Sequence, residues 1–223
     1  MKRISIAIAV LAVAVPVFAQ KADARLKEST AVLTTILEKQ SIPSALVNKA
    51  RCIMVYPGVK KVGIGLGVTY GRGVMVCREG QQMTGKWGAP IMYKLDVGSL
   101  GAQLGSTSTD YVLLVLSQRG ADKVLSGKLK LGAGAQAVAG PSGAQASAFN
   151  DPNVDILTYS QSKGLFAGAS LGSASMDADG DMNKELYGKD INASQIRESS
   201  TEIPAGAKPL ITELTKISPK HIS

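Results

Sequence analysis

The chain has 223 residues, 45% of them hydrophobic, which is enough apolar material for one well-formed core. Basic residues outnumber acidic ones, giving a formal net charge of +8, and His221 is the only histidine. This composition argues against a Ser-His-Asp triad, a Cys-His pair and multi-histidine metal sites. We therefore expect a single domain that is not an enzyme and needs no cofactor.

The first residues have the pattern of a secretory signal peptide. Lys2 and Arg3 precede an apolar run over residues 4–18 that is too short to span a bilayer comfortably, and small residues lie three and one before the expected cleavage point. We expect residues 1–19 to be removed and residues 20–223 to be exported to the bacterial periplasm or envelope, or secreted. An N-terminal membrane anchor is the alternative, because a slowly cleaved signal has a similar pattern.

The chain remains basic without Lys2 and Arg3. An exported basic protein meets anionic phospholipid headgroups in the compartment it enters, whereas it can meet nucleic acid only outside the cell. Anionic phospholipid is therefore the expected partner and nucleic acid is not. A positive excess that serves solubility alone is the other interpretation.

The mature chain begins with a helical pattern. Residues 22–38 have the spacing of an amphipathic helix, and its apolar side chains are Leu26, Leu33, Ile36 and Leu37. Ser41 and Pro43 then predict a second, short helix that ends near Ala50.

Beyond Arg51, β-branched residues and regularly spaced glycines predict a series of strands. The expected strands cover residues 52–56, 62–70, 74–78, 91–95, 99–104, 111–117, 129–138, 144–149, 154–160 and 165–173. Short helices are expected at 119–128, 183–187 and 205–217. Because the helices needed for parallel crossovers are missing, we expect an α+β fold that is β-rich and mostly antiparallel, sandwich-like or barrel-like, with an N-terminal amphipathic helix and short C-terminal helices.

The run VGIGLGVTYGRG, residues 62–73, resembles a phosphate-binding loop at first sight. A strand-forming stretch, VMVC, follows it, so no helix N-terminus is available for a phosphate, and no Gly-Lys-Ser or Gly-Lys-Thr triplet completes a P-loop. With a period of two, the apolar residues share one face and the glycines share the other. We expect another sheet or the N-terminal helix to pack against this bare face, and a lipid chain or headgroup is the alternative.

Basic residues near turns and strand ends can form a rim that attracts an anionic membrane. The candidate lipid-binding residues are Arg25, Lys27, Lys60, Lys61, Arg72, Lys86 and Trp87. Trp87, the only tryptophan, is either an aromatic anchor at the membrane interface or a side chain buried in the core, and the core is favoured.

Asp177, Asp179 and Asp181 alternate in the run DADGDMNKE and are the candidate calcium ligands. The EF-hand pattern is only partly matched, because Met182 and Gly188 stand where that loop requires glycine and glutamate. A solvated turn that caps the next helix through Asp181 or Asn183 is the favoured interpretation.

Cys52 and Cys77 are the only cysteines, and both lie in apolar strand-like segments. In an oxidising compartment they can form one disulfide. Two buried free thiols are the alternative.

Five segments, in this order, resemble the SYLF domain family of lipid-binding modules. They are residues 42–78, 86–120, 128–143, 156–175 and 185–188, which contain KWGAPIMYKLDVGSLGAQLGS, KLKLGAGAQAVAGPSG and ELYG. The resemblance covers a core from about Ser41 to Gly188 and leaves residues 189–223 as an extension.

The resemblance implies a non-enzymatic, membrane-associated domain with no catalytic residue. Eukaryotic members bind phosphoinositides, partly through an N-terminal amphipathic helix, and yeast members bind and bundle actin. For an exported protein only the broader affinity for anionic phospholipid is implied. Cys52 and Cys77 depart from the usual pattern of the family.

We therefore expect a lipid-binding protein of the bacterial envelope that uses the amphipathic helix and a basic surface. The alternative is a structural protein that forms a homo-oligomer or binds an envelope protein partner.

Overall fold

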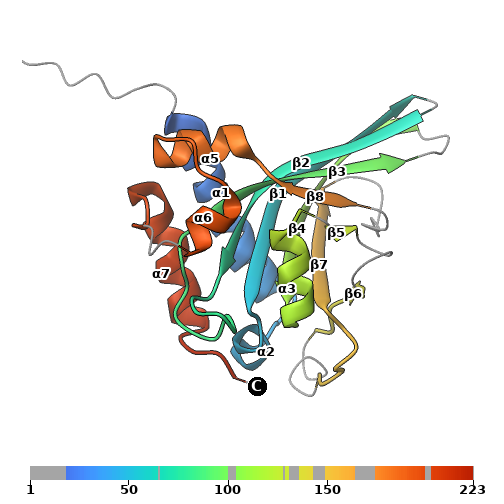
Figure 1. Cartoon of the computed structure of the whole chain (residues 1–223). Coiled ribbons are helices and arrows are strands. Elements are labelled where there is room, and N and C mark those ends of the chain that lie inside the picture. Colours follow the sequence, from blue (N-terminus) through green and yellow to red (C-terminus); the bar gives the residue numbers. More distant parts are fainter. Residues whose placement is uncertain are drawn as a thin grey trace, which may run out of the picture.

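The computed structural model describes residues 19–64, 66–99, 104–127, 129–130, 136–142, 149–163, 174–198 and 202–222. Within these residues, eight strands form one sheet in the order β5-β8-β3-β2-β1-β4-β7-β6 (Figure 1). The strands are β1 (Cys52–Ile64), β2 (Leu66–Cys77), β3 (Ile91–Ser99), β4 (Leu104–Val115), β5 (Leu129–Lys130), β6 (Ala137–Ala139), β7 (Ile156–Lys163) and β8 (Ser175–Ala178). The helices within the described residues are α1 (Ala19–Lys39), α2 (Ser44–Asn48), α3 (Gln118–Leu125), α5 (Gly180–Tyr187), α6 (Ala193–Glu198) and α7 (Lys208–Ile217), with a 3-10 turn η1 (Ala205–Ala207).

Each described strand pair is antiparallel except β6 with β7, which is parallel. The predicted β-rich α+β fold with a mostly antiparallel sheet is therefore confirmed. Within the described parts of the chain, none of the helices is both long and apolar enough to cross a bilayer.

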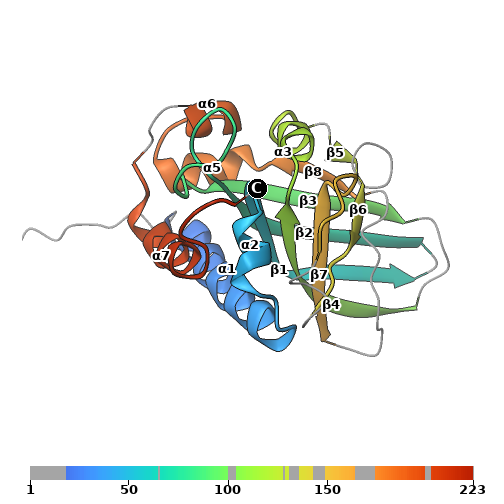
Figure 2. The same cartoon turned by 90° about the horizontal axis from the view of Figure 1, so that it is seen from below.

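The sheet is curled into a half-barrel. Its edge strands β5 and β6 are consecutive in the chain, separated only by residues 131–136. Eight flat strands spaced about 4.8 Å apart would hold the edges about 34 Å from each other, whereas the seven residue steps from one edge to the other span at most about 25 Å. The connection therefore requires curvature, which Figure 2 shows as the sheet turns from β3 towards β7.

Helices cover both sides of this sheet. α1 packs across β1, β2 and β4 and contacts α5 and α7, and the core on this side includes Ile53 and Val55 of β1. α3 and α6 contribute to the core on the other side, which includes Met54 and Tyr56 of β1. Successive residues of a strand point to opposite sides, so the alternation in β1 supplies both cores. We call the two sides the α1 face and the α3 face.

The apolar side of α1 is buried in the core. All four residues that the helical spacing predicts, Leu26, Leu33, Ile36 and Leu37, are at most 6% exposed. The helix is amphipathic as predicted, but the sheet covers its apolar side. This corrects the expected role of that side in membrane insertion.

A β-bulge interrupts β1 in its middle. Between Tyr56 and Val59 the strand has one residue more than β4 opposite it. Gly58 adopts φ 58°, and its N–H donates to Asp110 Oδ1 at 2.7 Å. The extra residue shifts the alternation, so Val59 lies on the α3 face with Tyr56, and the next residue begins the α1 face again.

The glycine run, expected to be one strand, is a hairpin. β1 ends at Ile64 and β2 begins at Leu66, with Gly63 opposite Gly67. The backbone is extended on both sides, and β2 leads to no helix that could hold a phosphate. The interpretation of this run as a nucleotide-binding loop is thus excluded, as predicted. The turn between β1 and β2 was not predicted.

Gly73 shows what approaches the bare face. A Cβ atom there would lie 2.2 Å from the Val55 carbonyl oxygen and 2.6 Å from the Tyr56 ring. At Gly71 the near neighbour is Val59, at 2.7 Å. The small residues thus accommodate the bulge of the adjacent strand, and the predicted packing of another sheet or of α1 against them is wrong at these positions.

The remaining predictions differ mainly in length. β3 and β4 are longer than expected, the expected strand at 129–138 is represented by the short strands β5 and β6, and β8 and α6 were not expected. The expected strand at 165–173 lies outside the described residues, as does 144–149 apart from Phe149. Residues 1–18 of the expected signal peptide also lie outside them.

A buried carboxylate ties α3 to β6 and β7. Asp155 is 1% exposed. It accepts hydrogen bonds from Arg119 Nη2 at 2.9 Å, from the Gln136 N–H at 3.0 Å and from Ser117 Oγ. Burial raises the pKa of Asp155, but these hydrogen bonds outweigh it, and the resulting pKa lies below the usual range.

Candidate functional site

The β1–β2 hairpin extends beyond the helices that cover the α1 face (Figure 1). We call residues 60–70 the projecting hairpin. It carries the three large hydrophobic side chains that are exposed among the described residues: Val62 at 43%, Val68 at 58% and Tyr70 at 48%. The register places Val62 opposite Val68 and Lys60 opposite Tyr70, so these four side chains share one face.

Basic residues border this apolar patch. Lys60 is exposed within it. Arg72 follows on the same face of β2, and its Nε lies 2.8 Å from Asp179 Oδ2 while about half of the side chain stays exposed. Lys94 of β3 is exposed opposite Arg72, and Asp96 is exposed opposite Tyr70. The patch is thus apolar at its centre and mainly basic at its base.

Two more of the predicted residues lie close to this region. Arg25 of α1 reaches the bulge, donating from Nη1 to the Pro57 carbonyl at 3.1 Å and pairing with Glu28 at 3.0 Å. Lys61 lies on the other face of β1, with Thr69 and Thr107 beside it. The structure therefore separates Lys60 from Lys61, which are adjacent in the sequence.

The other predicted residues do not join the patch. Lys27 is exposed on α1. Lys86 lies at the opposite end of β2, where it pairs with Glu79 at 3.6 Å. Trp87 is 2% exposed, and its Nε1 donates to the Ser218 carbonyl at 2.9 Å. Trp87 is thus a core residue, and its interpretation as a membrane anchor is wrong.

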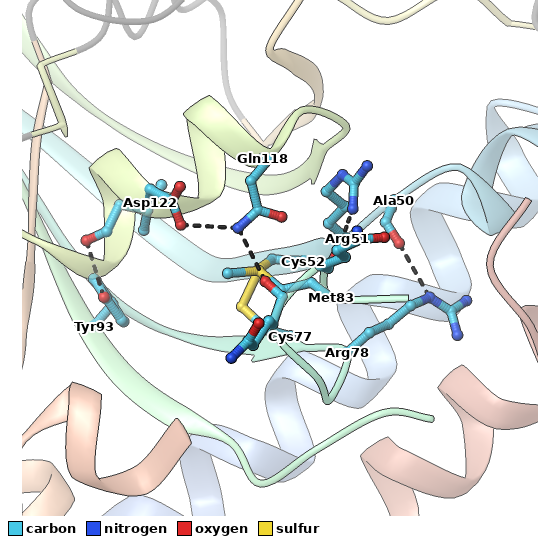
Figure 3. Close-up of a disulfide and its surroundings, with 12 residues drawn as sticks. Ala50, Arg51, Cys52, Cys77, Arg78, Met83, Tyr93, Gln118 and Asp122 are labelled. Carbon is cyan, nitrogen blue, oxygen red and sulfur yellow. Dashed lines mark hydrogen bonds between the residues drawn. A yellow bond between two sulfur atoms is a disulfide. The ribbon is translucent and has the colours of Figure 1, made fainter. Parts of the chain in front are cut away.

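The end of the β1–β2 pair opposite the projecting hairpin is buried and crosslinked. Cys52 and Cys77, paired across the two strands, are joined by a disulfide with a Cα–Cα distance of 3.9 Å. Figure 3 shows this bond with Arg51, Met83 and Arg78 around it, and Met83 Sδ lies 3.6 Å from Cys52 Sγ. The cysteines that the sequence leaves open as bonded or free are bonded.

Arg78 joins this end to the C-terminal helix. Its side chain is 1% exposed and lies over the Trp87 ring, 4.1 Å from the centroid. It donates to the carbonyl oxygens of Ala50, Gly85 and Ser218. Ser218 directly follows α7, so the guanidinium faces the carbonyl end of that helix, which carries partial negative charge. Burial lowers the pKa of Arg78 to about 10, which leaves it protonated at neutral pH. We call Cys52, Cys77, Arg78, Trp87 and Ser218 the closed end.

The three candidate calcium ligands do not converge. Asp177 lies in β8 opposite Lys94. Asp179 caps α5, accepting from the Met182 N–H at 3.2 Å, and pairs with Arg72. Asp181 is exposed in the first turn of that helix.

Among the residues with described positions, no group of three or more acidic, cysteine or histidine side chains could hold a metal ion. Asp177, Asp179 and Asp181 therefore do not form the calcium site that the sequence suggested. The helix cap is Asp179, buried at 4% exposure, and not Asp181 or Asn183 in a solvated turn.

Residues 96–217, from the outer part of β3 to the end of α7, match the family described as Ysc84, a Las17-binding protein and actin regulator. The chain belongs to the Ysc84 family. This confirms the resemblance to the SYLF domain family.

Relatives of the Ysc84 family match more of the chain. An SH3 domain-containing protein of Schizosaccharomyces pombe is 31% identical over 181 residues, which is 79% of this chain and 41% of the relative. Protein YSC84 of Saccharomyces cerevisiae is 29% identical over 77% of this chain and 37% of its own length. The human SH3 domain-containing YSC84-like protein 1 is 28% identical over 91% of this chain and 59% of its own length. The chain thus spans between about two fifths and three fifths of these relatives.

Proposed function

We propose that this Ysc84-family protein is a non-enzymatic module of the bacterial envelope that binds anionic phospholipid surfaces through the projecting hairpin. The observation that carries the proposal is the gathering of Val62, Val68 and Tyr70 on one uncovered face, with Lys60 and Lys94 beside them. In this proposal the projecting hairpin, and not α1, is the element that contacts the membrane, because the apolar side of α1 is already buried.

The expected binding is weak and reversible. Burying a Val or Tyr side chain that is about half exposed contributes roughly 1 kcal/mol, and each Lys or Arg near an anionic surface contributes about 1 kcal/mol. Asp96 opposes part of that attraction, and Arg72 already pairs with Asp179. The total of several kcal/mol resembles that of a single lipid chain, which alone gives only marginal anchoring.

Vesicle co-sedimentation tests the proposal. The protein is expected to pellet with vesicles of phosphatidylcholine and phosphatidylglycerol, less at high salt, and poorly with phosphatidylcholine alone. The double substitution Val68→Ser and Tyr70→Ser should reduce recovery severalfold, whereas Lys86→Gln, which removes an exposed lysine at the other end of β2, should not. Equal recovery on neutral and anionic vesicles would remove the headgroup claim. Unchanged recovery of the double variant would remove the hairpin claim.

A protein-interaction role is the second candidate. The family description and the name LAS seventeen-binding protein 3, given to a Saccharomyces cerevisiae relative that is 30% identical, refer to protein binding. The same apolar patch would suit a protein partner or a second copy of the chain. Light scattering that shows a dimer dissociated by Tyr70→Ser, without recovery on any vesicle, would favour this role.

A further inference from the structure

A cavity of about 170 Å³ lies next to the start of β1, at the opposite end of this strand from the projecting hairpin. Its lining includes three basic residues: Lys49 and Arg51 from the link between α2 and β1, and His221 from the C-terminal segment. Phe149 and Ile222 provide apolar walls. Basic groups from two distant parts of the chain thus meet in one hollow.

No carboxylate in the described part of the chain pairs with Lys49 or Arg51 at this hollow. Lys49 Nζ donates to the Phe149 carbonyl at 2.9 Å. Arg51 donates from Nη1 to the Gln82 carbonyl, while its buried Nε has no hydrogen-bond partner. Arg78, which does not line this cavity, donates to carbonyl oxygens and to the Ser218 hydroxyl.

Elsewhere in the described structure, Arg25, Arg72 and Arg119 each pair with a carboxylate, whereas the more deeply buried Arg78 does not. The acidic residue in the cavity lining is Asp151, which is exposed and accepts from the Asn153 N–H at 2.9 Å. Among the described residues, none therefore forms a salt bridge that offsets the positive charge of Lys49 and Arg51.

We propose that this cavity binds an oxyanion of the phosphate class, either inorganic phosphate or a phosphomonoester, with Arg51 and Lys49 as its principal partners. A guanidinium fork matches two phosphate oxygens, and a lysine adds a point charge. One ordered water needs only about 10–15 Å³ of such space, so the cavity has room for a phosphate with a short organic substituent.

His221 reports on the charge in the cavity. Burial, followed by the positive charges of Arg51 and Arg78, lowers its pKa, and a hydrogen bond with the Lys49 backbone opposes them. Asp151, in the same lining, is the acidic group near it. A bound dianion would offset Arg51 and Arg78, so the pKa of His221 should rise when phosphate binds.

This site is independent of the proposed membrane surface. Residues 52–59 of β1 lie between Arg51 and the projecting hairpin and span at most about 30 Å, and no residue of the projecting hairpin lines the cavity. Loss of one activity therefore leaves the other testable.

Because His221 is the only histidine, its imidazole proton gives a single resolved reporter in the NMR spectrum of the full chain. Inorganic phosphate, titrated at constant ionic strength, is expected to shift this signal in a saturable manner and to raise the apparent pKa. Arg51→Gln and Lys49→Gln should each weaken the apparent affinity at least tenfold, and Lys86→Gln should leave it unchanged. A linear shift without saturation, or a saturable one that neither cavity variant alters, would overturn the site.

Two further arms identify the source of the phosphate. Binding of glycerol 3-phosphate supports a soluble phosphomonoester. Binding that appears only with phosphatidic acid vesicles, not with phosphatidylglycerol vesicles, and that Lys49→Gln removes, supports a lipid headgroup instead. Absence of both, together with absence of a phosphate response, contradicts the proposal. Circular dichroism of each variant checks that the fold is kept, and Lys49→Gln, at a half-buried position, serves if Arg51→Gln does not fold.

Discussion

The two ends of the β1–β2 pair consist of the same two antiparallel strands, with the register shifted at the bulge between them, and they have different roles. At the closed end the strands are covered on both faces, crosslinked by Cys52–Cys77 and joined to the C-terminal helix through Arg78. At the projecting hairpin the α1 face is uncovered, and Val62, Val68 and Tyr70 are exposed. Apolar side chains at the closed end contribute to folding, whereas those of the hairpin remain available for a partner.

The largest difference in stability is expected from truncating one aromatic side chain at each end. Trp87→Ala should lower the free energy of unfolding by about 4 kcal/mol, because it leaves a cavity under Arg78 and removes the donor to Ser218. The matched change Tyr70→Ala should lower the free energy of unfolding by no more than about 0.5 kcal/mol, as is usual for exposed positions. Urea unfolding measures both, and equal losses at the two ends would contradict the comparison.

The disulfide gives the next largest effect. Replacing Cys52 and Cys77 with alanine opens a loop with a sequence separation of 25 residues, and loop closure of that length is worth about 3 kcal/mol. Thermal unfolding with and without a reductant checks this. The reductant should lower the melting temperature of the wild type and leave that of the double variant unchanged.

Asp155 makes the stability of the fold sensitive to pH, because its carboxylate ties α3 to the segment that leads into β6. Asp155→Asn should cost about 2 kcal/mol at pH 7 through weaker hydrogen bonds, an amount limited because Arg119 is largely exposed.

Because the folded-state pKa of Asp155 is lowered, its contribution is complete above the unfolded-state value of about 3.9 and is lost as the pH falls through the folded-state pKa. Denaturation of wild type and variant should therefore converge at low pH. A difference that stays constant from pH 7 to pH 2 would show that the charge of Asp155 is not its cause.

The smallest expected change in stability is at the projecting hairpin. Val68→Ser combined with Tyr70→Ser should alter the free energy of unfolding by less than about 1 kcal/mol, within the usual range for two surface positions. The same pair should reduce vesicle recovery severalfold. A variant that is strongly destabilised would show that the hairpin contributes to folding as well.

Periodicity in the sequence predicts much of the packing. It identifies four of the buried residues of α1, since they recur with the helical period. It also predicts that the glycines and the apolar residues of the run at 62–73 lie on opposite faces. It misses the hairpin, because Ile64 and Leu66 pair directly across Gly65 and the alternation continues through the turn.

The candidate sites are less visible in the sequence. Lys60 and Arg72 were identified, but Lys94 was not, because only the register of β2 with β3 brings it beside Arg72. The cavity joins Lys49 and His221, which are separated by most of the chain, and no local pattern connects them. Lys94 is brought beside Arg72 by strand pairing, and His221 is brought beside Lys49 because the C-terminal segment packs near the start of β1.

The bulge between Tyr56 and Val59 determines which side chains of the outer part of β1, residues 60–64, lie on the α1 face. Since successive residues of a strand alternate, deleting one residue there would exchange the two sides of everything beyond it. Lys61 would then take the side now held by Lys60 and Val62. Loss of a single codon could thus exchange the two faces of residues 60–64 without changing the identity of any of them.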